Sequence, residues 1–251
     1  MIRRLLPLSA GAILLGMTCA GMAAQNVSEQ YLFAAANQDR VAHGLRPVRV
    51  DENLARAARL HAFAMMEHRS ISHQFTGEQE LAARARDAGA HFSLVTENVA
   101  EAPNSAQIHD LWMASAGHRA NLLDPQVDSV GIAVVQMKGQ LYAVEDFART
   151  VAQMSIAQQE AAVGELLAVQ GLRLDGNKAD ARQTCTMSTG YVGKRQPLFV
   201  IRYSSSSLDR LPDQLRSKLE TGKYHEAVVG ACVTGKQTPF SGYNVAVMLF
   251  P

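Results

Sequence analysis

The sequence has few cysteines, a single tryptophan and almost no net charge, and these scarcities exclude several classes of protein. Among 251 residues there are three cysteines and one tryptophan, and 24 basic residues stand against 23 acidic ones. A chain without a basic excess is not suited to neutralise a phosphate backbone, so we expect no nucleic-acid partner. The sequence also lacks repeats of fixed period and long low-complexity tracts.

Hydrolase signatures are missing as well. No serine lies in a G-x-S-x-G elbow, no HExxH pair is present, and residues 26–150 contain no cysteine. A serine or cysteine nucleophile therefore has no recognisable setting, and a metal-activated water is the only other route to hydrolysis. The sequence leaves enzymatic activity uncertain and favours its absence.

Residues 1–24 contain a long apolar stretch. Arg3 and Arg4 precede this stretch, which ends in small residues, and the pattern is typical of a secretory signal peptide. We predict cleavage near Gln25, which leaves 22 basic against 23 acidic residues and a formal charge of −1. The alternative is an uncleaved membrane anchor. With cleavage, the protein is secreted or periplasmic and has no membrane span.

Helix signals dominate the first part of segment 26–150. Asn26 is suited to cap a helix that stops at Gly44, and Asp51 is suited to cap the next one. His61 falls on the apolar face of that second helix. We expect it to be a core histidine whose ring is hydrogen-bonded, because buried polar groups are usually satisfied locally.

A further helix is predicted over residues 77–89, and two apolar strands over residues 129–137 and 141–148 close the segment. The Lys-Gly pair between the strands indicates a hairpin. Because both strands are apolar on each face, we expect a sheet covered by helices on both sides. Three other histidines fall on polar stretches and are predicted to be solvated: His68, His91 and His109.

The stretch WMASAGHRANLL begins as an apolar helix and then breaks its own pattern. Trp112 continues the helical spacing of Ile108, and Gly117 follows shortly afterwards. We predict that Gly117 lets the backbone leave helical geometry. His118 would then turn away from the buried face that holds Trp112 and point toward a cleft.

Six pieces of this segment resemble a known family in both order and spacing. They are ANQDRVAHGLRPVRVDENLARAARLHAFAM, SH, TENVA, LWMASAGHRANLL, VGIAVV and LYAVEDF. Together they resemble bacterial members of the CAP superfamily, which includes cysteine-rich secretory proteins, insect venom antigens and plant pathogenesis-related proteins. The resemblance covers residues 30–150. It implies an α+β fold, a three-layer α-β-α sandwich with a cleft on one side, and an extracytoplasmic location.

The resemblance also implies a cleft lined by histidines and glutamates. His73 and Glu97 match the first histidine and first glutamate of the family, and His118 is common in its bacterial members. These three residues are the candidate ligand-binding set and the candidate metal set. A divalent metal such as zinc is the cofactor they would hold, because two histidines and a carboxylate form a known zinc-binding combination.

Three further positions depart from the animal and plant pattern. Ser115 stands where a glutamate is usual, Tyr142 where a second histidine is usual, and Glu145 where a glutamine is usual. We include them as weaker cleft candidates. The departures indicate a reduced, bacterial version of the cluster.

The candidate set has three interpretations that the sequence does not separate. It is a ligand-binding cleft, the centre of a metal-assisted peptidase or esterase, or a buried polar network that fixes loops to the sandwich. We favour an exported binding or interaction protein. Its partner is an unknown small molecule, lipid, peptide or envelope component, and no catalytic residue is assigned.

Residues 165–251 are predicted to form a smaller α+β module that resembles no family we recognise. It has a strand in PLFVIRY, four consecutive serines, a helix from Ser207 to Gly222, and two apolar strands at its end. Cys185 and Cys232 are an even number of cysteines in an exported chain, so we expect a disulfide between them. Two buried free thiols are the alternative.

Overall fold

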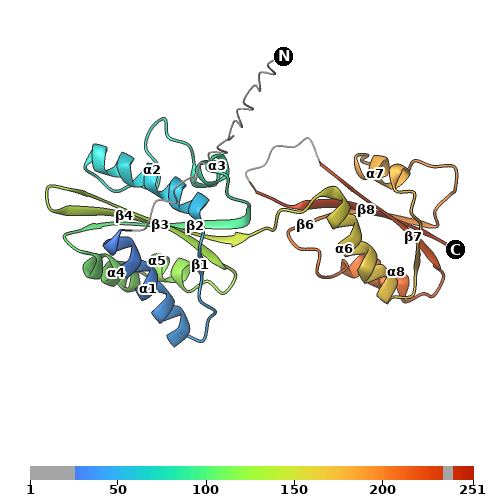
Figure 1. The fold of residues 1–251 in the computed structure, drawn as a ribbon, viewed down its shortest axis with the longest axis horizontal. Coiled ribbons are helices and arrows are strands. Elements are labelled where there is room, and N and C mark those ends of the chain that lie inside the picture. The colour runs from blue at the N-terminus through green and yellow to red at the C-terminus, as the bar shows by residue number, and fades with distance from the viewer. Residues whose placement is uncertain (1–25, 234–239) are drawn as a thin grey trace, which may run out of the picture.

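The computed structural model describes residues 26–233 and 240–251, which form two four-stranded sheets with helices on their faces (Figure 1). The signal peptide predicted over residues 1–24 lies outside the described residues. Among the residues described, no helix has both the length and the apolar character needed to cross a membrane. We call residues 26–150 the N-terminal half and residues 151–251 the C-terminal half, because each contains one of the sheets.

The N-terminal half follows most of the local signals in its sequence. Its elements are α1 (Val27–Ala42), β1 (Arg49–Val50), α2 (Glu52–His68), α3 (Leu81–Asp87), β2 (Phe92–Ala102), α4 (Ser105–Ala114), α5 (Ala116–Leu122), β3 (Ser129–Met137) and β4 (Gln140–Thr150). Asn26 caps α1 with Glu29 in a capping box, and Asp51 caps α2, as predicted. Helix α3 is shorter than the predicted 77–89.

The sheet of the N-terminal half has the strand order β1-β3-β4-β2. Strand β1 is parallel to β3, and the other neighbours are antiparallel. Helices α2 and α3 cover one face, while α1, α4 and α5 cover the other (Figure 1). The predicted three-layer α-β-α sandwich is therefore confirmed. Strand β2, at the edge of the sheet, was not predicted.

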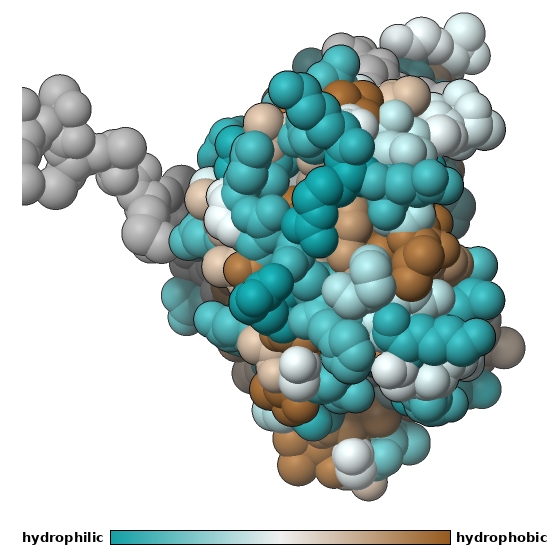
Figure 2. All heavy atoms as spheres, turned by 90° about the vertical axis from the view of Figure 1, so that its right-hand side faces the viewer, coloured by the Kyte–Doolittle hydropathy of each residue, from teal (hydrophilic) through white to brown (hydrophobic). Residues whose placement is uncertain are grey.

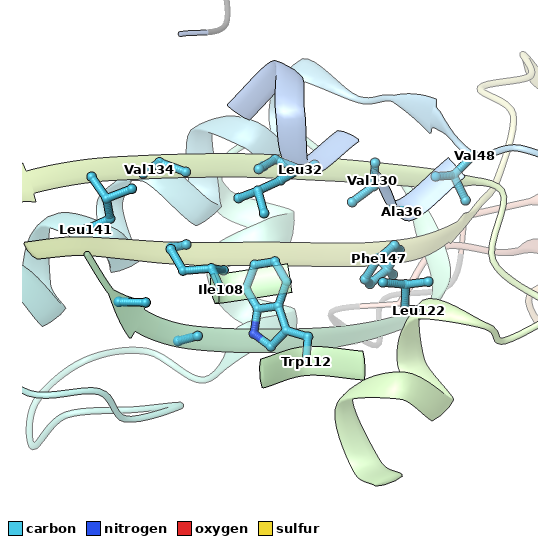
Figure 3. Packing of buried hydrophobic residues seen from close by; sticks show 14 of the residues in the cluster. Leu32, Ala36, Val48, Ile108, Trp112, Leu122, Val130, Val134, Leu141 and Phe147 are labelled. Carbon is cyan, nitrogen blue, oxygen red and sulfur yellow. The ribbon is translucent and has the colours of Figure 1, made fainter. Parts of the chain in front are cut away.

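The larger core of this half lies between the sheet and the layer of α1, α4 and α5. Trp112 is fully buried there with Ile108, Leu122 and Phe147. Figure 3 shows its indole ring between α4 and the strands. Burial of such apolar area is the main free-energy gain of the fold.

The C-terminal half is built from α6 (Ile156–Val169), β5 (Arg173–Leu174), α7 (Ala179–Cys185), β6 (Phe199–Ser205), α8 (Asp213–Leu219), β7 (Glu226–Cys232) and β8 (Tyr243–Phe250). Strands β6, β7 and β8 agree with the sequence analysis. The predicted helix from Ser207 is wrong at its start, because α8 begins only after Pro212. A proline disfavours helical geometry in the residue before it.

The two halves share one topology. The C-terminal sheet has the order β5-β7-β8-β6, with β5 parallel to β7 and the other neighbours antiparallel. Its elements follow one another as helix, strand, helix, strand, helix and two strands, as in the N-terminal half if α3 is left out and α4 and α5 are counted as one unit. The sequence had shown no repeat.

A disulfide joins Cys185, at the end of α7, to Cys232, at the end of β7, as predicted. Their Cα atoms lie 5.9 Å apart. The bond links α7 to the sheet that this helix covers. Figure 2 shows that the end of the molecule formed by the C-terminal half is mainly hydrophilic, with apolar side chains in separate patches.

Candidate functional site

The candidate site lies at the middle of β2, where polar side chains occupy both faces of the sheet. Glu97 of β2 is the cross-strand partner of Asp146 of β4, and Asn98 is the partner of Glu145. All four side chains are buried. Because neighbouring residues of a strand point to opposite faces, Glu97 and Asp146 share one face while Asn98 and Glu145 share the other.

On the face beneath α2 and α3, the Glu97 carboxylate is held from two sides. Its Oε1 lies 2.9 Å from Nδ1 of His73, and its Oε2 accepts a hydrogen bond from the Arg84 guanidinium. Glu97 and Arg84 are buried, whereas the His73 side chain is 62% exposed. The structure therefore brings the predicted His73 and Glu97 together, with the histidine at the surface and the carboxylate behind it.

The loop that carries His73 is pinned by buried groups. Arg84 also donates to the backbone oxygens of His73 and Gln79. The ring nitrogens of His61 lie 2.6 Å from Glu78 Oε1 and 2.7 Å from the Ser72 backbone oxygen. The prediction of a hydrogen-bonded core histidine at position 61 is confirmed. These contacts fix the position of His73, so its ring is presented by a supported loop.

Asp146 lies directly beside Glu97, as its cross-strand partner on β4. Neither of its carboxyl oxygens has a hydrogen-bond partner among the described residues. Burial raises the pKa of Asp146 well above its usual value; the neighbouring Glu97 carboxylate raises it further, and Arg84 lowers it. Two adjacent carboxyls cannot both ionise cheaply in a buried setting. Burial and the neighbouring carboxylate therefore both favour the neutral form of Asp146.

On the opposite face, amides connect β2 to α5. Asn98 donates to the backbone oxygen of His118, and Asn121 donates to Asn98 Oδ1 and to the backbone oxygen of Glu97. Glu145 is fully buried beside this chain of amides, and burial raises the pKa of Glu145 to about 8, although Asn98 opposes the rise. Its carboxyl is thus largely neutral at pH 7.

His118 reaches the site differently from the prediction. The break after α4 falls at Ser115, whose backbone is extended at φ −84° and ψ 123°. Gly117 lies inside α5, so the predicted break at Gly117 is wrong. A serine suits a helix boundary because its side chain competes for backbone hydrogen bonds. The His118 and His73 rings nevertheless approach each other, with 6.5 Å between their centroids.

The pKa values of the two imidazoles are shifted in opposite directions. The hydrogen bond to Glu97 raises the pKa of His73, against an opposing effect of partial burial. Partial burial lowers the pKa of His118, and the positive charge of His73 adds to that effect. The site therefore retains a proton on His73 to a higher pH than on His118.

The remaining predicted residues lie apart from this pair. Tyr142 is buried in an apolar cluster with Met65 and Val99, and Ser115 forms the joint between α4 and α5. The expectation that His109 is solvated is wrong, because its side chain is buried and its Nε2 lies 2.7 Å from Asp39. The helix that carries it packs against α1, which the sequence does not reveal.

The set His73, Glu97 and His118 does not fit a divalent metal as it is arranged. One Glu97 oxygen faces His73 and the other faces the Arg84 guanidinium, a cation that would repel a second one. In the described part of the chain, no group of three or more His, Cys, Asp and Glu side chains is positioned to hold a metal ion. We therefore derive no step through zinc.

Sequence reasoning missed Arg84 and Asp146 as members of the site. Asp146 stands in an apolar strand pattern, beside Phe147, and Arg84 is one of several arginines in its helix. Asn98 had a signal, because it follows Glu97 in the quoted TENVA piece. The polar centre of β2 also explains why that strand was overlooked, since Glu and Asn are depleted in strands.

The N-terminal half is thus a three-layer sandwich with a supported histidine and a buried carboxyl pair at its edge, and comparison with known proteins shows what it is similar to. Residues 33–150 match the model of the Cysteine-rich secretory protein family, named CAP. This segment is therefore similar to CAP domains.

Individual relatives match the same part of the chain. YkwD of Bacillus subtilis (strain 168) is 27% identical over 109 residues, which are 43% of this chain and 42% of YkwD. An extracellular protein containing a SCP domain from Bacillus anthracis str. Ames is 28% identical, with 49% of this chain and 40% of that chain covered and a TM-score of 0.45. An outer surface protein of Borrelia burgdorferi is 19% identical, with 49% and 92% covered and a TM-score of 0.46. The chain thus spans less than half the length of the two Bacillus proteins.

Proposed function

We propose that this protein is an exported binding protein whose ligand contacts His73 and His118 at the edge of the N-terminal sheet. Glu97 orients His73, and the buried Asp146 carboxyl, whose pKa is raised, lies behind it. One observation carries the proposal: the other sheet of the molecule, with the same strand order, has no polar group at the corresponding positions.

The correspondence follows from the strand registers. Following the cross-strand partners of the second residue of β1 across β3 reaches Phe147 on β4. Following those of the second residue of β5 across β7 reaches Leu249 on β8. Phe147 and Leu249 therefore occupy corresponding positions. One residue before each of these positions, Asp146 and its partner Glu97 correspond to Met248 and its partner Val200. By the same count, Asn98 and Glu145 correspond to Ile201 and Val247.

A sheet of this topology can therefore form with apolar residues at its centre. Burying carboxyls without full hydrogen bonding costs free energy, commonly about 1–3 kcal/mol for each unsatisfied group. Glu145 and Asp146 are the buried carboxyls of this centre whose oxygens have no hydrogen-bond partner among the described residues, so we assign the polar centre to binding. Because its hydrogen bond to Glu97 raises the pKa of His73, this ring is suited to a ligand with an acceptor of negative charge, such as a carboxylate or phosphate, which stabilises the imidazolium form.

The test follows the imidazole signals of His73 and His118 by NMR while probes are added. The probes are acetate, inorganic phosphate, a tripeptide with a free carboxylate, and phosphatidylglycerol vesicles compared with phosphatidylcholine vesicles. We expect one probe class to shift both histidines together and to lose its effect in His73→Ala. The control is His43→Ala, which removes an exposed imidazole from the end of α1. If no probe shifts either ring, or if shifts persist in His73→Ala, the proposed site is wrong.

Export is tested separately by locating the mature chain. Sequencing of the N-terminus of protein recovered outside the cytoplasm should find a start near Gln25. The disulfide fits an oxidising compartment. Recovery of the full-length chain from the cytoplasm or inner membrane contradicts export and cleavage.

A second candidate function has one observation in its favour. His73 with Glu97 behind it has the geometry of a histidine oriented by a carboxylate, which is the arrangement of a general base. The same protein is incubated with a panel of peptides and esters, and turnover is measured from pH 5 to pH 9. Turnover that is lost in His73→Ala replaces the binding function by a hydrolase. No turnover leaves binding as the function.

A further inference from the structure

A polar cavity of about 370 Å³ lies where the chain crosses from the N-terminal to the C-terminal half, at the end of β4 (Figure 1). We call it the junction cavity. Arg149 lines it from β4, and Asp209 and Arg210 line it from the segment after β6. Three of the four consecutive serines noted in the sequence, Ser205 to Ser207, complete its described lining. The volume lies within the range of ordinary small-molecule sites, about 300–1,000 Å³.

The two arginines of the junction cavity are accessible and uncommitted. Both are exposed, and in the part of the chain that the structure describes neither guanidinium forms an ion pair or a hydrogen bond. Arg216, with a smaller contribution from Arg210, lowers the pKa of the Asp213 carboxylate, which is paired with Arg216 at 2.5 Å. A guanidinium stays charged at physiological pH, and its planar fork of N–H groups matches two oxygens of a phosphate. Two such groups that line one cavity favour an anionic ligand.

Two serine hydroxyls add hydrogen-bond donors to the wall. The Ser205 hydroxyl donates to the Ser207 backbone oxygen at 2.5 Å and accepts the Ser207 N–H at 3.2 Å. The Ser207 hydroxyl accepts the Asp209 N–H at 3.2 Å, which leaves its own O–H available as a donor. The Ser206 hydroxyl makes no hydrogen bond with the described residues. Ser206 and Ser207 are both partly exposed, so their hydroxyls can reach a ligand.

Asp209 is the acidic member of the described lining and opposes an anion. It is exposed and forms no ion pair with either arginine. Asp128 lies in an adjoining cavity that shares Arg149, and its Oδ1 accepts the N–H and the hydroxyl of Thr150, each at 2.9 Å. A phosphate group carries a charge of about −1.5 to −2 at pH 7 and three acceptor oxygens. It therefore gains more from two guanidiniums than a singly charged carboxylate does.

We propose that the junction cavity binds the phosphate group of a small ligand, with the guanidiniums of Arg149 and Arg210 and the hydroxyls of Ser206 and Ser207 as its donors. The donors come from both halves of the molecule, so the ligand joins the halves at the point where the chain crosses between them. This site does not depend on the proposed function at β2.

The probes are inorganic phosphate and glycerol 3-phosphate, with acetate as the carboxylate counterpart and glycerol as the neutral one. The mature chain is titrated by NMR at constant ionic strength with up to about 10 mM of each probe, ten times a Kd of about 1 mM. We expect both phosphates to shift the backbone signals of Ser206 and Ser207 and the Nε signals of Arg149 and Arg210. Tighter binding of inorganic phosphate identifies a free anion, and tighter binding of glycerol 3-phosphate identifies a monoester. Equal shifts with acetate or glycerol, or no shift with either phosphate, overturn the proposal.

Three variants locate the binding. Arg149→Gln and Arg210→Gln each remove a cation and should weaken phosphate binding about tenfold, whereas Asp209→Asn removes the opposing charge and should tighten it about threefold. Arg46→Gln is the matched control, because Arg46 is an exposed arginine outside the lining. The ring signals of His73, followed in the same titration, report binding at the β2 site separately. Affinity that is unchanged in all three cavity variants, in protein with unchanged thermal melts, or shifts confined to His73, refute the site.

Discussion

The two halves of this protein hold a buried glutamate between helix and sheet in the same way, but the centres of their sheets differ in polarity. In each half a buried glutamate of the first helix accepts a backbone N–H from the sheet and pairs with an arginine of the second helix. Glu29 takes Val134 N–H and Arg59, each at 3.1 Å. Glu160 takes Ala231 N–H at 3.2 Å and Arg182 at 2.6 Å.

These matched pairs show what a buried carboxylate needs in this topology. Both Glu29 and Glu160 are almost completely buried, yet each has a cation and a backbone donor. Glu145 and Asp146, at the centre of the N-terminal sheet, have no such partners among the described residues. The contrast teaches that buried carboxyls are compensated where they hold helix to sheet. In the part of the chain that the structure describes, the buried carboxyls without hydrogen-bond partners lie at the candidate site.

The largest effect is expected from the core of the N-terminal half. Trp112→Ala should lower the free energy of unfolding by about 5 kcal/mol, because it removes the largest fully buried side chain and leaves a cavity. Urea melts followed by circular dichroism measure the loss. Leu111→Ala, a change at the exposed neighbour, is the control and should cost less than about 1 kcal/mol. Similar losses for both would show that the packing described around Trp112 is wrong.

The disulfide should stabilise only the C-terminal half. The double change Cys185→Ser and Cys232→Ser removes a bridge between residues 47 apart in sequence, which should cost about 4 kcal/mol through the unfolded chain. Trp112 is the single tryptophan and lies in the other half, so its fluorescence reports the N-terminal half alone. We expect the circular dichroism melt to gain an early step that fluorescence does not detect. Identical early steps by both methods would mean that the halves unfold together.

Close packing of helix on strand should be equally strict in both halves. A Cβ atom at Gly131 would lie 2.1 Å from the backbone nitrogen of Ala55 in α2, and one at Gly230 would lie 2.2 Å from a backbone carbon of Ala181 in α7. Gly131→Ala and Gly230→Ala should each cost about 3 kcal/mol in denaturant melts.

The control for these glycines is Gly117→Ala in α5, where an added Cβ meets nothing within 4 Å. Alanine favours a helix interior, so this change should stabilise by up to about 1 kcal/mol. If Gly230→Ala were as harmless as Gly117→Ala, the two halves would differ in packing and not only in the polarity of their sheets.

The polar centre should make stability depend on pH. The pKa of Glu145 is raised to about 8 from an ordinary value of 4.5. Between these values the folded state holds a proton that the unfolded state releases, so Glu145 lowers stability progressively as pH rises from about 4.5 to 8. Glu145→Gln cannot ionise. Relative to the wild type, its stability should rise by about 3 kcal/mol between pH 5 and pH 8.

Urea melts at pH 5, 6, 7 and 8 measure the difference between wild type and Glu145→Gln, so other titrating groups cancel. Asp110→Asn removes an exposed carboxylate and serves as the control, with no change in the pH profile. A difference that stays constant over this range would show that Glu145 is not held neutral by burial.

The smallest effect is expected at the candidate site itself. His118→Ala should cost about 1 kcal/mol, because its ring is partly exposed and water replaces its contacts. His61→Ala should cost about 3 kcal/mol, because His61 is buried between Glu78 and Ser72. Denaturant melts of both variants measure these losses in the free energy of unfolding. Equal and large losses would make His118 a structural residue and remove it from the binding site.

Sequence reasoning succeeded where a residue acts on its neighbours. The caps at Asn26 and Asp51, the hairpin strands and the core role of His61 all follow from local pattern. It failed where a contact between residues distant in sequence determines a residue's environment. His109 was expected to be solvated but pairs with Asp39 of α1, and β2 was overlooked because its centre is polar.

The order of amino acids by itself determined the sandwich, its family resemblance and the pairing of Cys185 with Cys232, because helix caps, apolar periodicity and cysteine parity are local or compositional properties. Only the tertiary structure decided that Glu97 meets Asp146, that Arg84 joins them, and that a second sheet repeats the topology with an apolar centre. The register of β2 on β4 sets these contacts. Register depends on the whole buried face of a sheet, and no short stretch of sequence carries that information.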